Sequence, residues 1–189
     1  GGTGEGDGAL PQHVQWNGTN WVNAYEDEQY IRIRSETGST LVKGQAVFVS
    51  ASYDNDYPKV GLARADSLTT MPCIGVVYAN LNDGESGLAV TFGRADIATG
   101  VSMGGSPAEG ETVYVSPDTA GRLTADKPTG STHLIQNVGV VVKDAPGQER
   151  IKVTGIGRAN DIPNTITLGA TTITSASAEF ADVKAHSVM

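Results

Sequence analysis

The side chains that most often perform catalysis or bind metal are few in this chain and widely separated. The three histidines, His13, His133 and His186, fall in different segments and lack the short spacing of zinc ligands. No serine, histidine and acidic residue are placed as a catalytic triad would require. We therefore expect no catalytic residue, no metal site and no cofactor.

Two acidic turns are better candidates for ligand chemistry. Residues 54–56 read Asp-Asn-Asp and residues 82–85 read Asn-Asp-Gly-Glu, so both turns could offer oxygen atoms to Ca²⁺. Neither turn follows the twelve-residue calcium-loop pattern, and Asp and Asn are also ordinary turn residues. We interpret both segments as structural turns.

The most informative pattern is an internal repeat. Three segments recur in the same order and at nearly constant spacing, and the pairs are 44–50 with 110–116, 74–77 with 138–141, and 88–95 with 151–159. Such self-similarity indicates two copies of one β unit. Arg94 and Arg158 hold equivalent places in the third pair, where an arginine could bind a carboxylate or the neighbouring copy through two hydrogen bonds. Alternatively, they are equivalent surface positions kept from a duplication.

The segments that must position these residues read as short strands separated by turns. Residues 30–34 alternate apolar and polar side chains, as a half-buried strand does. Further strands are expected at 46–50, 62–65, 74–79, 88–92, 112–116, 121–124, 134–142 and 150–156. The predicted fold class is mainly β, with two tandem small barrel or sandwich lobes, 26–103 and 104–160.

The two ends of the chain differ from these lobes. Residues 1–12 form a Gly-rich arm, and residues 13–25 predict a hairpin in which Asn17-Gly18 turns between strands carrying Trp16 and Trp21. In the C-terminal tail, 161–189, Thr alternates with apolar residues over 165–174, which predicts a lone strand, and a short helical spacing follows over 176–186. A lone strand or hairpin needs a partner. We therefore expect subunit contacts at both ends, through Trp16, Trp21, Ile166, Leu168, Ile173 and Phe180.

Composition limits the classes of partner. The 189 residues carry a net charge of −8, which disfavours phosphate backbones and anionic membranes, so we expect neither a nucleic-acid nor a membrane partner. No apolar run approaches the roughly 20 residues that span a bilayer. Cys73 is the single cysteine and precedes an apolar strand, which predicts a buried structural thiol and no disulfide within the chain.

A series of segments resembles a known family. From Ser35 to Ile156 the chain resembles a domain common in tailed-bacteriophage virion proteins, seen in tail fibres and related to some capsid decoration proteins. The matching segments are 43–50, 60–65, 74–78, 87–93, 110–116, 121–128, 133–142 and 151–153. Residues 14–22 also look like a small hairpin of phage fibre and appendage proteins. The resemblance implies a virion location, a structural part without an active site, usually a homotrimer, and other tail or capsid proteins as partners.

Three functions follow as alternatives. The first is a trimeric tail-fibre or appendage segment, because the arm, the hairpin and the tail strand all need neighbouring chains. The second is a capsid decoration or head-spike protein that uses the same lobes as a clip. The third is a carbohydrate-binding module or polysaccharide hydrolase, which would need exposed aromatic side chains or a carboxylate pair in a cleft, whereas aromatic residues make up only 6% of the chain.

Overall fold

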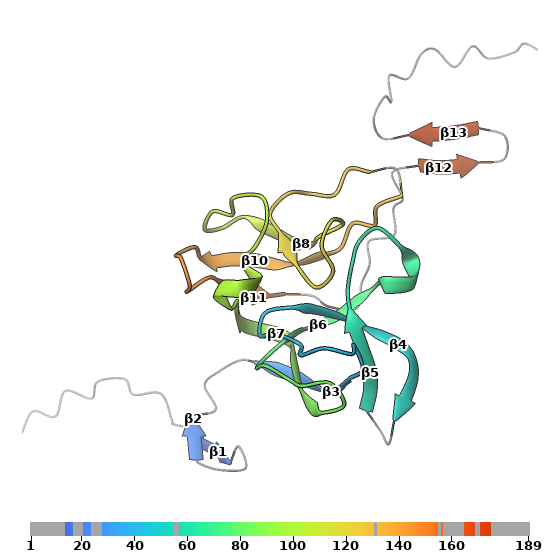
Figure 1. The fold of residues 1–189 in the computed structure, drawn as a ribbon. Helices are drawn as coiled ribbons and strands as arrows, with labels where there is room; N and C mark the ends of the chain where they lie inside the picture. Colours follow the sequence, from blue (N-terminus) through green and yellow to red (C-terminus); the bar gives the residue numbers. More distant parts are fainter. Residues whose placement is uncertain are drawn as a thin grey trace, which may run out of the picture.

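The computed structural model describes residues 14–16, 21–23, 28–54, 57–130, 132–154, 156, 165–168 and 171–174 (Figure 1). These residues form β-strands and two short 3₁₀ helices, so the predicted mainly β class is confirmed. The strands are β1 (Val14–Trp16), β2 (Trp21–Asn23), β3 (Gln29–Ser35), β4 (Ala46–Asp54), β5 (Tyr57–Leu62), β6 (Cys73–Val77), β7 (Ser86–Asp96), β8 (Thr112–Val115), β9 (Leu123–Thr124), β10 (Asn137–Lys143), β11 (Arg150–Val153), β12 (Thr165–Leu168) and β13 (Thr171–Thr174). The 3₁₀ helices are η1 (Leu68–Thr70) and η2 (Thr99–Val101). Within this part of the chain, no helix has the length and apolar character needed to cross a membrane.

Nine strands form one sheet in the order β3-β5-β4-β6-β7-β11-β10-β8-β9. Strand β3 also pairs with β7, so β3, β5, β4, β6 and β7 close into a ring while the other four strands extend from β7. The long strand β7 therefore serves both halves: its first part pairs with β3 and β6, and Gly93–Asp96 pairs with β11. Gly93 stands where the partners change, and its φ of +99° is one that residues with a side chain rarely adopt.

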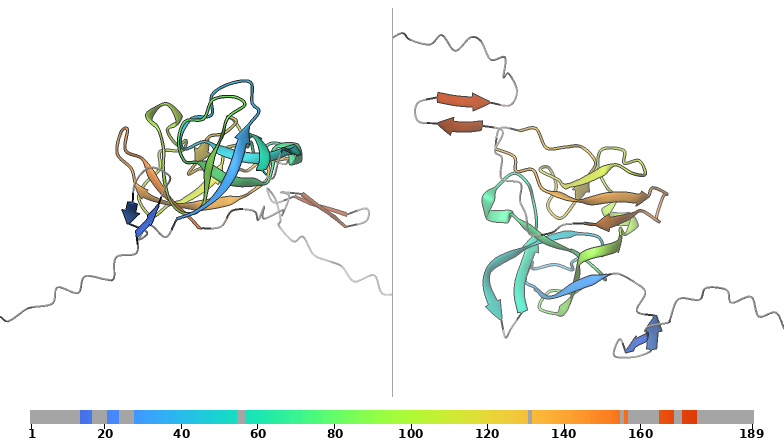
Figure 2. Two further views of the ribbon diagram at one scale, coloured as in Figure 1. Left: turned by 90° about the horizontal axis from the view of Figure 1, so that it is seen from below. Right: turned by 180° about the vertical axis from the view of Figure 1, so that it is seen from behind.

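Two groups of buried side chains make the core. The smaller group takes one residue from each strand of the ring, Ile33, Val47, Val60, Val77 and Ala89, and therefore fills the ring. The larger group combines residues of both halves, from Ala46 and Val76 to Val113 and Ile151. The described parts of 26–103 and 104–160, expected as two tandem lobes, share one sheet and one core and lie side by side (Figure 2).

Direct hydrogen bonds also join the halves. Ala46 N–H donates to the Gly121 carbonyl at 2.8 Å, and Leu134 N–H donates to the Ala65 carbonyl at 2.7 Å. The strand expected at 62–65 lies earlier than predicted, at β5 (Tyr57–Leu62). Residues 63–65 instead run between the halves outside any strand, and the buried side chains of Ala63 and Ala65 are small enough for the two backbones to approach.

The halves repeat one strand order and one turn. The order β5-β4-β6-β7 recurs as β9-β8-β10-β11. Gly44 N–H donates to the Val77 carbonyl at 2.9 Å, and Gly110 N–H donates to the Val141 carbonyl at 2.8 Å. Both glycines have a left-handed φ, +92° and +89°. Segments that repeat in sequence therefore also repeat in hydrogen bonding.

The remaining four strands form two separate hairpins. In the first, β1 pairs with β2 and Trp16 stands opposite Trp21, which confirms the predicted strands. In the second, β12 pairs with β13. This pairing corrects the lone strand expected over 165–174: Gly169-Ala170 interrupts the Thr-rich run, and each half of the run finds its partner in the other. The Gly-rich arm and the helical spacing at 176–186 lie outside the described residues.

Candidate functional site

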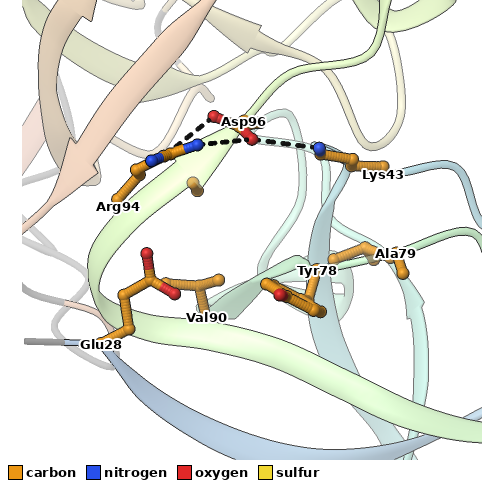
Figure 3. Close-up of a pocket in the computed structure, with 9 residues that line it drawn as sticks. Glu28, Lys43, Tyr78, Ala79, Val90, Arg94 and Asp96 are labelled. Atoms are coloured by element: carbon orange, nitrogen blue, oxygen red, sulfur yellow. Dashed lines mark hydrogen bonds and ion pairs between the residues drawn. The ribbon is translucent and has the colours of Figure 1, made fainter. Parts of the chain in front are cut away.

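Three cations, Lys43, Arg94 and Arg150, converge on the carboxylate of Asp96 at the end of β7. Figure 3 shows the contacts of Lys43 and Arg94. Lys43 Nζ lies 3.1 Å from Oδ2, and Arg150 Nε lies 2.7 Å from Oδ1. Arg94 donates from Nε to Oδ1 at 3.2 Å and from Nη2 to Oδ2 at 3.3 Å. Together, these contacts tie β7 to β11 and to the turn before β4.

The strand register explains the cluster. Arg150 stands directly opposite Asp96 in the β7–β11 pair, so both side chains project from one face of the sheet. Arg94 precedes Asp96 by two residues on the same strand and shares that face because side chains alternate. Lys43 comes from the turn that also holds Gly44, and its carbonyl accepts a hydrogen bond from Ala98 N–H at 3.2 Å.

The surroundings keep the Asp96 carboxylate charged. Its partial burial alone would raise its pKa, but hydrogen bonds from Arg94, Arg150 and Lys43 hold the pKa well below the usual range of an aspartate. A carboxylate with so low a pKa is a poor proton donor or acceptor near neutral pH. The cluster therefore acts as a structural link between elements.

Two shallow cavities lie on either side of the Lys43–Asp96 pair. One has a volume of about 270 Å³ and is also lined by Glu28, Tyr78 and Arg94 (Figure 3). The other has a volume of about 350 Å³ and is also lined by η2 and by residues 147–150. Among the described residues that line the first cavity there is no histidine, cysteine or serine.

The arginine pair can be placed only in part. Arg94 belongs to the Asp96 cluster and binds a carboxylate of its own strand. Arg158 lies outside the described residues. No local pattern in the sequence connects Lys43, Asp96 and Arg150, although Arg94 and Asp96 form an Arg-x-Asp pair whose alternate spacing on a strand would have indicated a shared face.

The expected interface residues lie on the two hairpins. Trp16 and Trp21 are opposite each other, Ile166 is opposite Ile173, and Leu168 is opposite Thr171. Phe180 lies outside the described residues. Their contact with a second subunit stays a prediction.

Where the structure describes them, side chains considered as metal ligands accept hydrogen bonds from other groups of the protein. In the turn 82–85, Asp83 Oδ1 accepts a hydrogen bond from Gly38 N–H at 2.9 Å, and Asn82 Oδ1 accepts one from Thr40 Oγ1 at 3.1 Å. His133 Nδ1 accepts from Gly130 N–H at 3.1 Å. His13, His186 and residues 55–56 lie outside the described residues. In the described part of the chain, no three His, Cys, Asp or Glu side chains gather closely enough to hold a metal ion.

An exposed aromatic surface went unnoticed in the sequence. Tyr78, Leu88 and Phe92 are 46%, 40% and 37% exposed, and they lie on or beside β7. Tyr30 packs edge-on against Tyr78 with ring centroids 5.2 Å apart. Alternation along 88–92 indicated a strand, but it could not show that β3 and the end of β6 would add tyrosines to the same face.

Comparison with solved structures gives a distant likeness. No protein-family model matches the chain, and a search of curated proteins finds no match. Among solved structures, the chain is similar to the N base of head fiber gp8.5 of bacteriophage phi29, with 12% sequence identity and a TM-score of 0.41. The similarity covers 69% of this chain and 98% of that chain.

Proposed function

We propose that the chain is a structural part of a tailed-phage virion, a trimeric tail-fibre or appendage segment whose copies assemble through their terminal hairpins. The observation that carries this proposal is the pairing of β1–β2 and β12–β13. Within the described residues each hairpin is a sheet of two strands that pair only with each other. An isolated two-stranded sheet is marginal in water, and its unpaired edges invite pairing with another chain.

The body of the molecule suits a mechanical role. The segments that resemble phage virion proteins fall mainly on β4 to β11, which belong to one sheet with a shared core. The strand order and the glycine turn of the first half recur in the second, which supports an origin by duplication of one β unit. A block of this kind transmits force without needing an active site, and we propose no enzymatic activity.

Subunit counting tests the assembly. Mass photometry and sedimentation velocity of the 189-residue chain should give three copies per particle. Trp16→Ala and Trp21→Ala should lower the trimer fraction at micromolar concentration while the thermal unfolding of the nine-stranded sheet stays unchanged. Leu68→Ala, which truncates a side chain 71% exposed on η1, is the matched control and should leave both measurements as in the parent.

Two results would redirect the proposal. A monomer at micromolar concentration would contradict the trimer and favour the carbohydrate-binding module. If the trimer forms, electron microscopy of virions labelled with an antibody to this chain should place the label on the tail. Label over the capsid would instead support the decoration or head-spike alternative.

A further inference from the structure

One face of the nine-stranded sheet gathers exposed aromatic and apolar side chains. Tyr78 N–H donates to the Leu88 carbonyl at 3.0 Å, which places these two residues side by side. Arg32 and Leu88 are partners in the β3–β7 register, and Tyr30 and Val90 are the next such pair. Because side chains of paired residues share a face, Tyr30, Arg32, Tyr78 and Leu88 form one continuous surface.

Phe92 extends this surface along β7. It stands in register with Gln29, just before the partner change at Gly93, and is 37% exposed. Three of the five large apolar side chains that the described residues expose most therefore lie on this face, namely Tyr78, Leu88 and Phe92. Such gathering on one face of a soluble domain is typical of an interaction site.

Cations stand at both ends of the face. Arg32, beside Leu88, lies 4.7 Å from the ring centroid of Tyr57 and donates to its hydroxyl at 2.7 Å. Lys152, on β11, places its Nζ 5.7 Å from the ring centroid of Phe92. In a chain of net charge −8, an aromatic face bounded by two cations favours a partner that is both aromatic and acidic.

The N-terminal segment of the chain has this composition. Its first 27 residues contain both tryptophans, Trp16 and Trp21, and no lysine or arginine. They carry four carboxylates, at Glu5, Asp7, Glu26 and Asp27. The tryptophans stand opposite each other in the β1–β2 register, and the acidic residues flank this hairpin on both sides in the sequence.

We propose that the face of Tyr30, Tyr78, Leu88 and Phe92 binds the N-terminal segment of a second copy. The tryptophan hairpin of that copy covers the aromatic side chains, and its acidic residues face Arg32 and Lys152. The inference rests on the proposed assembly of copies and adds the surface and the segment that meet. Because hairpin and face are different surfaces, the contact runs head to tail and closes into a ring, as a trimer requires.

A photo-crosslinker identifies the occupant. Benzoylphenylalanine replaces Trp16 in the full chain, and the products are sized and mapped by mass spectrometry after irradiation. The expected product has the mass of two chains and joins residue 16 to a peptide containing residues 78–92. A crosslink to those residues within a single chain would show that the hairpin covers its own face, and a crosslink elsewhere would show another contact; either result overturns the proposal.

Charge exchange provides an independent measurement. Lys152→Glu changes an exposed position and should lower the trimer fraction at least tenfold near the dissociation midpoint. In the Lys152→Glu background, the additional changes Glu26→Lys and Asp27→Lys should restore most of the trimer fraction. Leu88→Asp should act in the same direction as Lys152→Glu, whereas Val142→Asp, at an apolar side chain 51% exposed on β10, is the control and should have no effect.

The outcomes separate the two proposals. If the parent chain is monomeric at every concentration tested, the proposed assembly fails and this inference fails with it. If the parent is trimeric but Lys152→Glu and Leu88→Asp fold normally and leave the trimer intact, assembly stands and this face is not its contact. Circular dichroism and thermal melts of each variant confirm that the sheet is folded.

Discussion

The side-chain amide of Gln136 takes the place of a neighbouring strand for the backbone of Cys73. Cys73 N–H donates to Gln136 Oε1 at 2.7 Å, and Gln136 Nε2 donates to the Cys73 carbonyl at 2.8 Å. Both residues are fully buried. Since Cys73 begins β6 and Gln136 precedes β10, this pair of hydrogen bonds joins the two halves inside their shared core.

Replacing Gln136 with leucine should destabilise the fold strongly. The change leaves the N–H and the carbonyl of Cys73 buried without partners, and each such group costs about 1–3 kcal/mol. We expect the free energy of unfolding to fall by about 2 kcal/mol or more, measured by guanidinium denaturation. Gln148→Leu, at an exposed residue of the β10–β11 turn, is the control; an equally small effect of both changes would mean that water replaces the lost bonds.

Asp96→Asn should remove a pH-dependent part of the stability. The pKa of Asp96 is lowered by folding, so the carboxylate stabilises the native state above its unfolded pKa of about 4, and this stabilisation is lost as the pH falls through and below that value. At pH 7 we expect a loss of about 1–2 kcal/mol, because its partners are half-exposed and such pairs contribute less than buried ones.

Thermal melts of both proteins between pH 7 and pH 3 measure this effect. The difference between the parent and Asp96→Asn should shrink as the pH falls below about 4. Asp144→Asn changes an exposed carboxylate in the β10–β11 turn and should leave the pH profile of the parent intact. A difference that stays constant over the whole range would show that the charge of Asp96 contributes nothing.

Gly139→Ala should lower the free energy of unfolding considerably, although it adds only one methyl group. A Cβ at Gly139 would lie 2.9 Å from the Lys152 carbonyl carbon, and backbone cannot move aside as a flexible side chain does. We expect a loss of about 1–3 kcal/mol or more by urea denaturation. Gly75, its counterpart in the repeat, is similarly tight, with Ala89 Cβ 2.7 Å from the added atom.

Gly100→Ala is the matched control for both glycines. Nothing lies within 4 Å of a Cβ built at Gly100, and its φ is outside the left-handed region. Its free energy of unfolding should change by less than about 0.5 kcal/mol. If Gly139→Ala were as mild as this control, β10 and β11 would have to be more widely spaced than the structure shows.

Local patterns predicted the strands well because their causes are local. The alternation of residues 30–34 and the turn glycines Gly44 and Gly110 correspond to β3 and to the starts of β4 and β8. The closure of the ring by β3 and β7 was not predictable in this way, because it joins residues 29–34 with residues 86–92 and depends on the whole topology.

The contacts of the site residues were likewise not predictable from local sequence patterns. The Asp96 cluster unites Lys43, Arg94 and Arg150 from three segments, and only the β7–β11 register brings Arg150 to Asp96. Gln136 reads in sequence as an ordinary polar residue, and only burial beside Cys73 gives it a role. The Thr-rich run misled because alternation identifies a strand without showing where the chain reverses.

Cys73 should be unreactive in the native protein. It is fully buried, and this burial raises the pKa of its thiol to about 11, although hydrogen bonds with backbone groups of Gly75 and Val47 oppose the rise. Because the thiolate is the reactive form, Ellman's reagent at pH 8 should modify Cys73 only after guanidinium unfolds the chain. As a control, Thr129→Cys in a Cys73→Ala background puts a thiol on an exposed loop and should react within seconds. Rapid labelling of the native parent at pH 8 would contradict the burial of β6 between the two halves.

The same raised pKa of Cys73 predicts a loss of stability in alkali. The free energy of unfolding should fall as the pH rises above about 9, because the unfolded thiol ionises there and the folded one does not. Cys73→Ala should lack this alkaline loss.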